Sequence, residues 1–130
     1  MKHFIFLFLI ILSGSVYAQQ ESFQPPRRVF TVAEHPAQFP GGEEALQKYF
    51  SENLIQPQTR KEQTVVTTFI VNETGVIQDV QVLKPRKKAF NDEAVRVIKN
   101  MPAWTPALQS GHVVAYKVEL PVVFHAQKQQ

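Results

Sequence analysis

Two consecutive stretches rich in β-branched residues constrain the fold most strongly, "TVVTTFIV" (Thr64–Val71) and "VIQDVQVL" (Val76–Leu83). Valine, isoleucine and threonine favour extended backbone because their branched side chains pack well on a pleated surface. The turn-forming "NETG" (Asn72–Gly75) alone separates the two stretches, and a short loop that contains glycine joins antiparallel neighbours. The sequence therefore predicts a β-hairpin. Polar and apolar residues alternate in its second strand, which predicts a sheet covered on one face.

Apolar residues recur at helical spacing before and after the hairpin. Before it, the spacing predicts a helix from Gly42 to about Asn53. After it, "FNDEAVRVIKNM" predicts a helix with Asn91 as its N-cap. The alternating "VVAYKVELPVVF" (Val113–Phe124) predicts a last strand, and Val29–Val32 a short edge strand. The order helix–strand–strand–helix–strand predicts an α+β fold, a small antiparallel sheet of about three strands with both helices on one face.

The N-terminal stretch "MKHFIFLFLIILSGSVYAQQ" has the layout of a secretory signal peptide. A basic residue comes first, a short apolar run follows, and small residues precede the expected cleavage after Ala18. A membrane-spanning helix needs roughly 20 apolar residues, so an uncleaved inner-membrane anchor is the less favoured alternative. We expect a signal peptide at 1–18, a flexible polar lead-in at 19–36, one domain at 37–125 and a disordered tail at 126–130.

The stretch "FPGGEE" (Phe39–Glu44) raises the question of a phosphate-binding loop, because glycine-rich entries to helices often hold phosphates. Glu43 and Glu44 stand where the phosphate would bind, which argues against that reading. We expect Gly41 and Gly42 to form a sharp entry into the helix, with Phe39 packed back against it. The acids complement the helix dipole.

No residue pattern indicates catalysis. The chain lacks cysteine, and its four histidines have neither a partner one helical turn away nor a metal-like spacing. The sequence therefore predicts no enzyme, no cofactor and no metal. Trp104 is expected to fill the core.

A basic run is the most charged feature of the sequence, and it is either a solvated loop or a contact for anionic cell-wall polymer or lipid headgroups. Its basic residues are Lys84, Arg86, Lys87 and Lys88.

Backbone at the edge of the predicted sheet is the other candidate binding surface. An unblocked edge invites a further strand, and strand addition draws its affinity from main-chain hydrogen bonds. At roughly 0.5–1.5 kcal/mol net for each bond, a few bonds predict weak to moderate, reversible binding.

Three segments resemble, in order, the TonB C-terminal domain, most closely the version common in Bacteroidetes. They are "AQFPGGEEALQKYFSENL", "VTTFIVNETGVIQDVQVLK" and "FNDEAVRVIKNMPAWTPALQSGHVVAYKVELPVVF". The likeness spans Ala37–Phe124, and several spaced motifs in the right order are more specific than any one alone.

The resemblance implies a periplasmic module that binds an outer-membrane transporter's extended "TonB box" as an added strand. The docking edge it implies is the last strand, Val113–Val123. The expected signal peptide directs the chain out of the cytoplasm, so no nucleic-acid partner is expected. The contact residues expected there are Val113, Val114, Ala115, Tyr116, Lys117, Val118 and Glu119.

The sequence also departs from the family pattern. A full energy transducer begins with an anchoring helix and a long proline-rich spacer, and neither is apparent in this sequence. The loop Gln56–Thr64 is shorter than usual, and the "PG" after the tryptophan is Pro106–Ala107. Two hypotheses follow. The chain either binds a transporter segment and takes part in or modulates uptake, or it is a self-associating or peptidoglycan-binding structural module, for instance a homodimer through the edge strand.

Overall fold

The computed structural model describes residues 27–128, which form one α+β domain with two helices and five strands. The expected signal peptide at 1–18 and the first part of the lead-in lie outside the described residues. The predicted order of two helices and three long strands is confirmed, and two short strands join it. The elements are β1 (Val29–Phe30), α1 (Gly42–Asn53), β2 (Gln63–Val71), β3 (Ile77–Lys84), α2 (Lys88–Lys99), β4 (Ala107–Gln109) and β5 (His112–Phe124).

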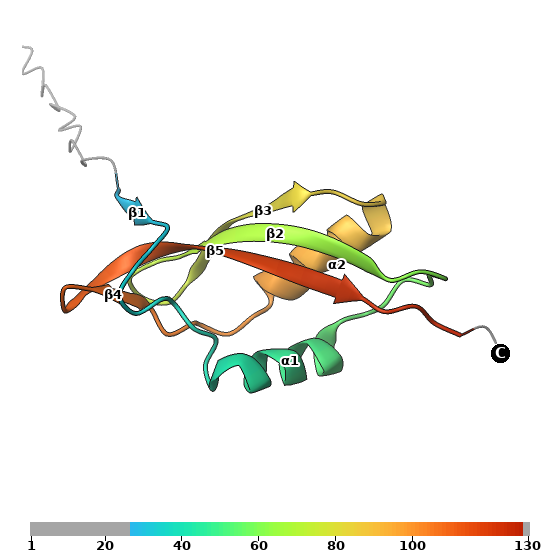
Figure 1. The fold of residues 1–130 in the computed structure, drawn as a ribbon, viewed down its shortest axis with the longest axis horizontal. Coiled ribbons are helices and arrows are strands. Elements are labelled where there is room, and N and C mark those ends of the chain that lie inside the picture. The colour runs from blue at the N-terminus through green and yellow to red at the C-terminus, as the bar shows by residue number, and fades with distance from the viewer. Residues whose placement is uncertain (1–26, 129–130) are drawn as a thin grey trace, which may run out of the picture.

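The sheet has the order β1-β5-β2-β3. Strand β2 is antiparallel to β3, and to β5 from Val71 opposite Tyr116 to Gln63 opposite Phe124. Strand β1 pairs in parallel with β5, and β4 pairs with it antiparallel. The sheet is therefore mixed rather than purely antiparallel. In Figure 1, α1 lies beneath β5, and α2 crosses behind β2 and β3.

Aromatic side chains dominate the core between the sheet and the helices. Phe69 and Phe124 are fully buried. Phe90 from α2 meets Phe124 edge-to-face at 5.1 Å between ring centroids. Trp104 lies between Phe69 and Phe39, with centroids at 5.2 and 5.8 Å. Trp104 is 6% exposed, so the prediction that it fills the core is confirmed.

Helix α2 begins at Lys88, so the prediction of Asn91 as its N-cap is wrong. Phe90 must turn inward to reach the core, where it is 5% exposed, and helical backbone before Asn91 achieves this. Asn91 shapes the helix entry from inside the first turn. Its Oδ1 accepts a bond from the Arg86 N–H and its Nδ2 donates to the Arg86 carbonyl, both at 2.7 Å.

The ordered domain extends beyond the predicted 37–125 at both ends. The lead-in predicted to be flexible supplies β1, and His35 exchanges backbone hydrogen bonds with Leu108 at 3.1 and 2.9 Å. At the other end, within the predicted tail, the Gln127 N–H donates to the Thr59 carbonyl at 3.0 Å. These segments are held by backbone partners distant in sequence, which local composition does not reveal.

A polar clamp fixes α1 to α2. The Tyr49 hydroxyl donates to the Val97 carbonyl at 2.7 Å. Glu93 accepts a bond from the Ile55 N–H at 2.8 Å and pairs with Arg96 at 2.6 Å. The Arg96 guanidinium also donates to the Asn53 carbonyl at 2.8 Å. The clamp holds the C-terminal end of α1 in place.

Replacing Glu93 with glutamine should destabilise the domain in a pH-dependent way. The hydrogen bond from Arg96 lowers the pKa of Glu93, and the Ile55 N–H adds to this against an opposing effect of burial. A lowered pKa contributes stability that is present above the unfolded value of about 4.3 and is lost as the pH falls through the folded value. We expect a loss of about 1–2 kcal/mol in the free energy of unfolding at neutral pH.

Urea unfolding of the wild type and the glutamine variant, at neutral pH and at about pH 3, tests this expectation. The difference between the two proteins in the free energy of unfolding should shrink at the lower pH. Glu52→Gln is the control, because Glu52 is exposed and lies 3.9 Å from Lys48 in a surface pair worth little. An equal loss for Glu93→Gln at both pH values would contradict the account.

Candidate functional site: the open edge of β5

Strand β5 has a free edge along its second half. From Lys117 to Phe124 it pairs with β2 alone. Its neighbour on the other side, β1, pairs with Ala115 and Tyr116 only. No strand of residues 27–128 pairs with that edge beyond Tyr116. In Figure 1, β5 runs on past β1 toward the C-terminus, with α1 beneath it.

Two observations indicate which backbone groups face this edge. Pro121 lies opposite Val66 in the β2–β5 ladder. Proline has no N–H to donate to a paired strand, so the backbone nitrogen and carbonyl of Pro121 point away from β2. The Arg86 Nε donates to the Thr64 carbonyl at 3.1 Å from beyond the end of β3. The backbone N–H and C=O of Thr64 therefore point toward β3. Because these groups point to alternate sides along a strand, those of Val65, opposite Val122, point toward β5.

Both observations place the backbone groups of the odd-numbered residues of β5 on the open edge. The parallel pairing of Phe30 with Tyr116 uses the Lys117 N–H, because a residue in a parallel ladder bonds to the residues on either side of its partner. Glu119 and Val123 each offer a free N–H, and Lys117, Glu119, Pro121 and Val123 each offer a carbonyl. The edge therefore presents two donors and four acceptors in one row. That pattern suits an extended segment, because each residue of a strand carries one donor and one acceptor.

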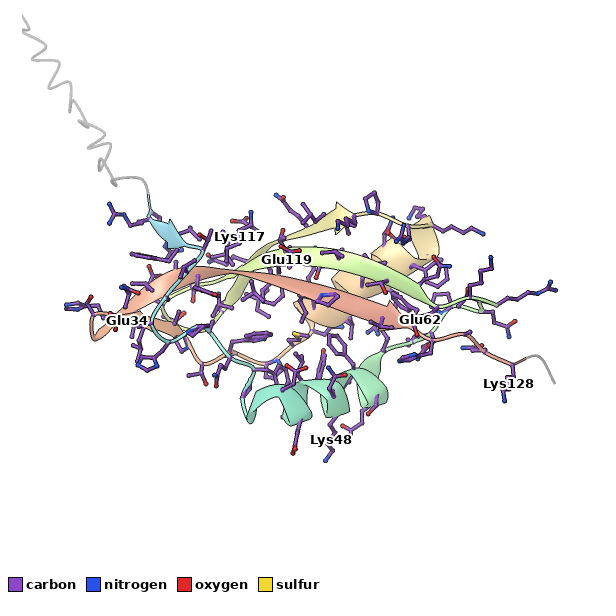
Figure 2. The ribbon with its side chains drawn as sticks, viewed as in Figure 1. Glu34, Lys48, Glu62, Lys117, Glu119 and Lys128 are labelled. Carbon is purple, nitrogen blue, oxygen red and sulfur yellow. The ribbon has the colours of Figure 1, made fainter. Side chains whose placement is uncertain are left out.

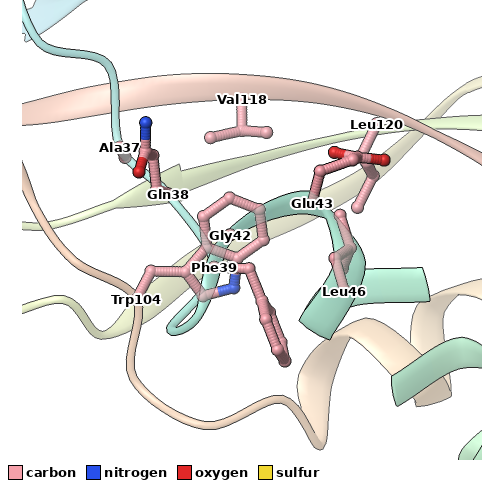
Figure 3. A pocket seen from close by; sticks show the side chains of 9 residues that line it. All are labelled: Ala37, Gln38, Phe39, Gly42, Glu43, Leu46, Trp104, Val118 and Leu120. Atoms are coloured by element: carbon pink, nitrogen blue, oxygen red, sulfur yellow. The ribbon is translucent and has the colours of Figure 1, made fainter. Parts of the chain in front are cut away.

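A groove runs between this edge and α1. It consists of two hollows of about 300 and 510 Å³ that share Glu43 and Leu120. In Figure 3, Val118 and Leu120 descend from β5 toward Phe39 and Leu46 in the first hollow. The second hollow is lined by polar and apolar side chains in equal number, and the apolar ones include Phe50, Leu54, Pro121 and Val123.

The glycine pair shapes the wall of the groove. Gly41 and Gly42 have φ values of 90° and 83°, in the left-handed region. A Cβ on Gly41 would lie 2.8 Å from the Ala45 Cβ, so a side chain there would crowd the helix. The turn places the Phe39 ring 5.5 Å from the Tyr49 ring, and Phe39 is 7% exposed. The predicted sharp helix entry and the inward packing of Phe39 are confirmed.

Trp104 connects the groove to the hairpin. Its backbone N–H donates to the Gly75 carbonyl at 2.9 Å, and the next residue, Thr105, exchanges backbone bonds with Gln38. The indole Nε1 is buried and has no hydrogen-bond partner in the described chain. The Phe39 ring stands edge-to-face with the indole at 88°. Trp104 thus fixes the β2–β3 turn against the segment that enters α1.

The opposite edge of the sheet is less suited to a further strand. The pairing of β3 with β2 has two register shifts, between Val66 and Thr67 and between Thr68 and Ile70. Asp79 in β3 has a φ of 52°, which is unusual for a residue with a side chain. Irregular pairing of this kind bends a strand and protects an edge.

The predicted docking residues divide into two groups. Val113 and Val114 already pair with β4, and Ala115 and Tyr116 already pair with β1. The stretch of β5 with a free edge therefore starts at Lys117, within the predicted docking strand. Of the seven predicted residues, Lys117, Val118 and Glu119 lie in it. In Figure 2 the side chains of Lys117 and Glu119 lie on the side of β5 away from α1.

The residues of the basic run lie at the end of the molecule where β3 ends and α2 begins. Lys84 is the last residue of β3, and Lys87 precedes α2. Arg86 donates to the Thr64 carbonyl, and Lys88 pairs with Asp92. The structure brings Arg60 and Lys61 to the same end, which sequence reasoning missed. The sequence could have indicated this, because Arg60 and Lys61 come just before β2, and the start of β2 lies beside the end of β3 in an antiparallel hairpin.

Between residues 27 and 128 no cluster of three metal-ligating side chains occurs. Over the same residues, neither helix has the length and hydropathy that a membrane crossing requires.

One comparison identifies a related family. The family described as Gram-negative bacterial TonB protein C-terminal matches residues 56–126. The match covers more than half of the chain and extends from the segment before β2 to just beyond the end of β5. Helix α1, which forms one wall of the groove, precedes it. The comparison with curated proteins gave no match.

Proposed function

The chain belongs to the TonB C-terminal family, and on that premise we propose that it is a periplasmic binding module for the TonB box of an outer-membrane transporter. Domains of this family generally interact with outer-membrane receptors. The box, an extended segment, adds to β5 as a further strand, and by this contact the chain takes part in or modulates transport. The observation that carries the proposal is the free edge from Lys117 to Phe124, with the groove beside it.

The chemistry of the edge sets the strength of the contact. Each main-chain hydrogen bond contributes roughly 0.5–1.5 kcal/mol net, and association costs at least several kcal/mol. Apolar side chains in the two hollows add to the hydrogen bonds. The sum favours reversible binding of weak to moderate affinity.

The pleat of an added strand sets its side-chain pattern. Alternate side chains point to opposite faces of a sheet, so every second residue of the segment enters the groove. The walls near Leu46 and Phe50 favour apolar side chains there. Glu43, shared by the two hollows, disfavours an acidic side chain where they meet.

Titration of residues 19–130 with TonB-box peptides tests the proposal. We expect chemical-shift changes along Lys117–Val123 in the NMR spectrum, because new hydrogen bonds form at that edge. A peptide of the same length with alternate residues replaced by proline is the control, since it lacks those backbone donors. The absence of shift changes at that edge at millimolar peptide would contradict the proposal.

The same edge supports the second hypothesis, self-association. Its backbone donors and acceptors can also pair with those of a second copy laid antiparallel, as in a symmetric dimer. Light scattering of the isolated protein over a range of concentrations distinguishes the two. A stable dimer that disappears in Glu119→Pro would assign the edge to a second copy rather than to a transporter segment.

A further inference from the structure

Basic side chains gather at the end of the domain where β2 begins and β3 ends. We define the basic pole as Arg60, Lys61, Lys84, Arg86, Lys87 and Lys88. Two acids, Glu62 and Asp92, lie nearby in the sequence. The rest of residues 27–128 contains seven basic and eight acidic residues. The pole, with six bases against two acids, therefore accounts for the positive charge of the described domain.

The fold brings the two parts of the pole together. Lys84 lies opposite Val66 at the end of the hairpin, and the chain before β2 supplies Arg60 and Lys61. Arg60, Lys61 and Lys87 line one groove of about 500 Å³, with Phe90 among its apolar lining residues. The groove is therefore rimmed by positive charge from two separate loops.

Nearby acids neutralise only a small part of this charge. Glu62 lies 3.4 Å from the His125 Nδ1, and Asp92 pairs with Lys88. In the described part of the chain, five bases of the pole have no acidic partner: Arg60, Lys61, Lys84, Arg86 and Lys87.

Exposed aliphatic side chains accompany the pole. Leu83, directly before Lys84, is 53% exposed, and Ile55, at the start of the loop that carries Arg60, is 67% exposed. Basic side chains interspersed with aliphatic ones suit the boundary between headgroups and acyl chains. An anionic polymer in solution would use the charges and leave the aliphatic side chains in water.

From these observations we propose that the basic pole docks the domain on a membrane surface rich in anionic phospholipid. The phosphates of the headgroups lie against Arg60, Lys61, Lys84 and Lys87, and Leu83 and Ile55 contact the interface. β1, where the chain enters the domain, lies at the opposite end (Figure 1). Glu62 and Lys128 mark the pole end in Figure 2. The proposal does not depend on strand addition to β5.

Co-sedimentation with lipid vesicles tests the proposal. Residues 19–130 are used, because they contain every described element and exclude the apolar run that would itself enter a bilayer. We expect binding to phosphatidylcholine vesicles that contain about one third phosphatidylglycerol, and none to phosphatidylcholine alone. Raising the salt to about 0.5 M should release the protein, because salt screens the contact.

Two matched charge reversals locate the contact. Arg60→Glu/Lys61→Glu/Lys87→Glu should weaken binding to anionic vesicles at least tenfold. Arg28→Glu/Lys48→Glu/Lys99→Glu changes the net charge equally and should weaken it far less. Leu83→Ser should also weaken vesicle binding. Circular dichroism checks that each variant is folded. Affinity for the TonB-box peptide should be unchanged by the first charge reversal, so the two proposals can be tested separately.

Several results would overturn the proposal. An equal loss of vesicle binding in the two charge-reversed variants would mean that net charge alone governs binding. Release of the protein from the vesicles by inorganic phosphate, added at the same concentration as the lipid phosphate, would assign the pole to a free anion. Sedimentation with peptidoglycan but not with anionic vesicles would assign it to the cell wall, and failure to bind any of these would leave it a solvated surface.

Discussion

Glu119→Pro is expected to weaken binding of a TonB-box peptide at least tenfold while the domain stays folded. The backbone of Glu119 faces the open edge, two residues before Pro121, which the ladder with β2 already accommodates. Proline at 119 removes a donor from the centre of the edge, and its ring obstructs an approaching strand. Calorimetry measures the affinity, and thermal unfolding shows whether the fold is kept.

Two variants control for the side chain and for the direction of the backbone. Glu119→Ala removes the carboxylate but keeps the N–H, so it should bind nearly as the wild type does. Leu120→Pro removes a donor that faces β2, opposite Thr67, and should destabilise the domain. Peptide affinity unchanged in Glu119→Pro would show that the added strand pairs elsewhere.

Gly75→Ala should cost roughly 3 kcal/mol or more in the free energy of unfolding. Gly75 has a φ of 85°, and a Cβ there would lie 2.1 Å from the Trp104 carbonyl oxygen. Left-handed backbone costs an alanine roughly 1–2 kcal/mol, and relieving such an overlap costs typically 1–3 kcal/mol more. Trp104 also donates its N–H to the Gly75 carbonyl at 2.9 Å, so the two segments cannot separate freely.

Gly111→Ala is the matched control for this prediction. Gly111 has a φ of 73°, but a Cβ there would meet no atom within 4 Å. Gly111→Ala should lower the free energy of unfolding only by the backbone strain, roughly 1–2 kcal/mol. Urea unfolding of both variants gives the comparison. Equal losses would show that the contact between the turn and Trp104 does not limit stability.

The long elements of the fold were predictable because their patterns are local. Helix α1 occupies Gly42–Asn53 as predicted, since its apolar spacing and its glycine entry both lie within one short stretch. The hairpin of β2 and β3 was equally predictable from β-branched runs around a turn. The start of α2 was not, because Phe90 is drawn into the helix by a contact with Phe124, which is distant in sequence.

The short strands and the exact extent of the open edge were not predictable in this way. Strand β4 has three residues and β1 has two, too few for a periodic pattern. Their pairing with the first part of β5 decides that the free edge starts at Lys117. The groove also depends on distant segments, because Phe39 and Trp104 line it together. The choice of the last strand as the docking edge rested on resemblance to the family.

Amide hydrogen exchange with and without bound TonB-box peptide tests the central claim most directly. The N–H groups of Glu119 and Val123 face the open edge, so they should exchange fast in the free domain and slow markedly in the complex. The N–H groups of Val118, Leu120 and Val122 face β2 and should be protected in both states. Protection that appears on β3 instead, or no change at the two edge amides under saturating peptide, would contradict the account.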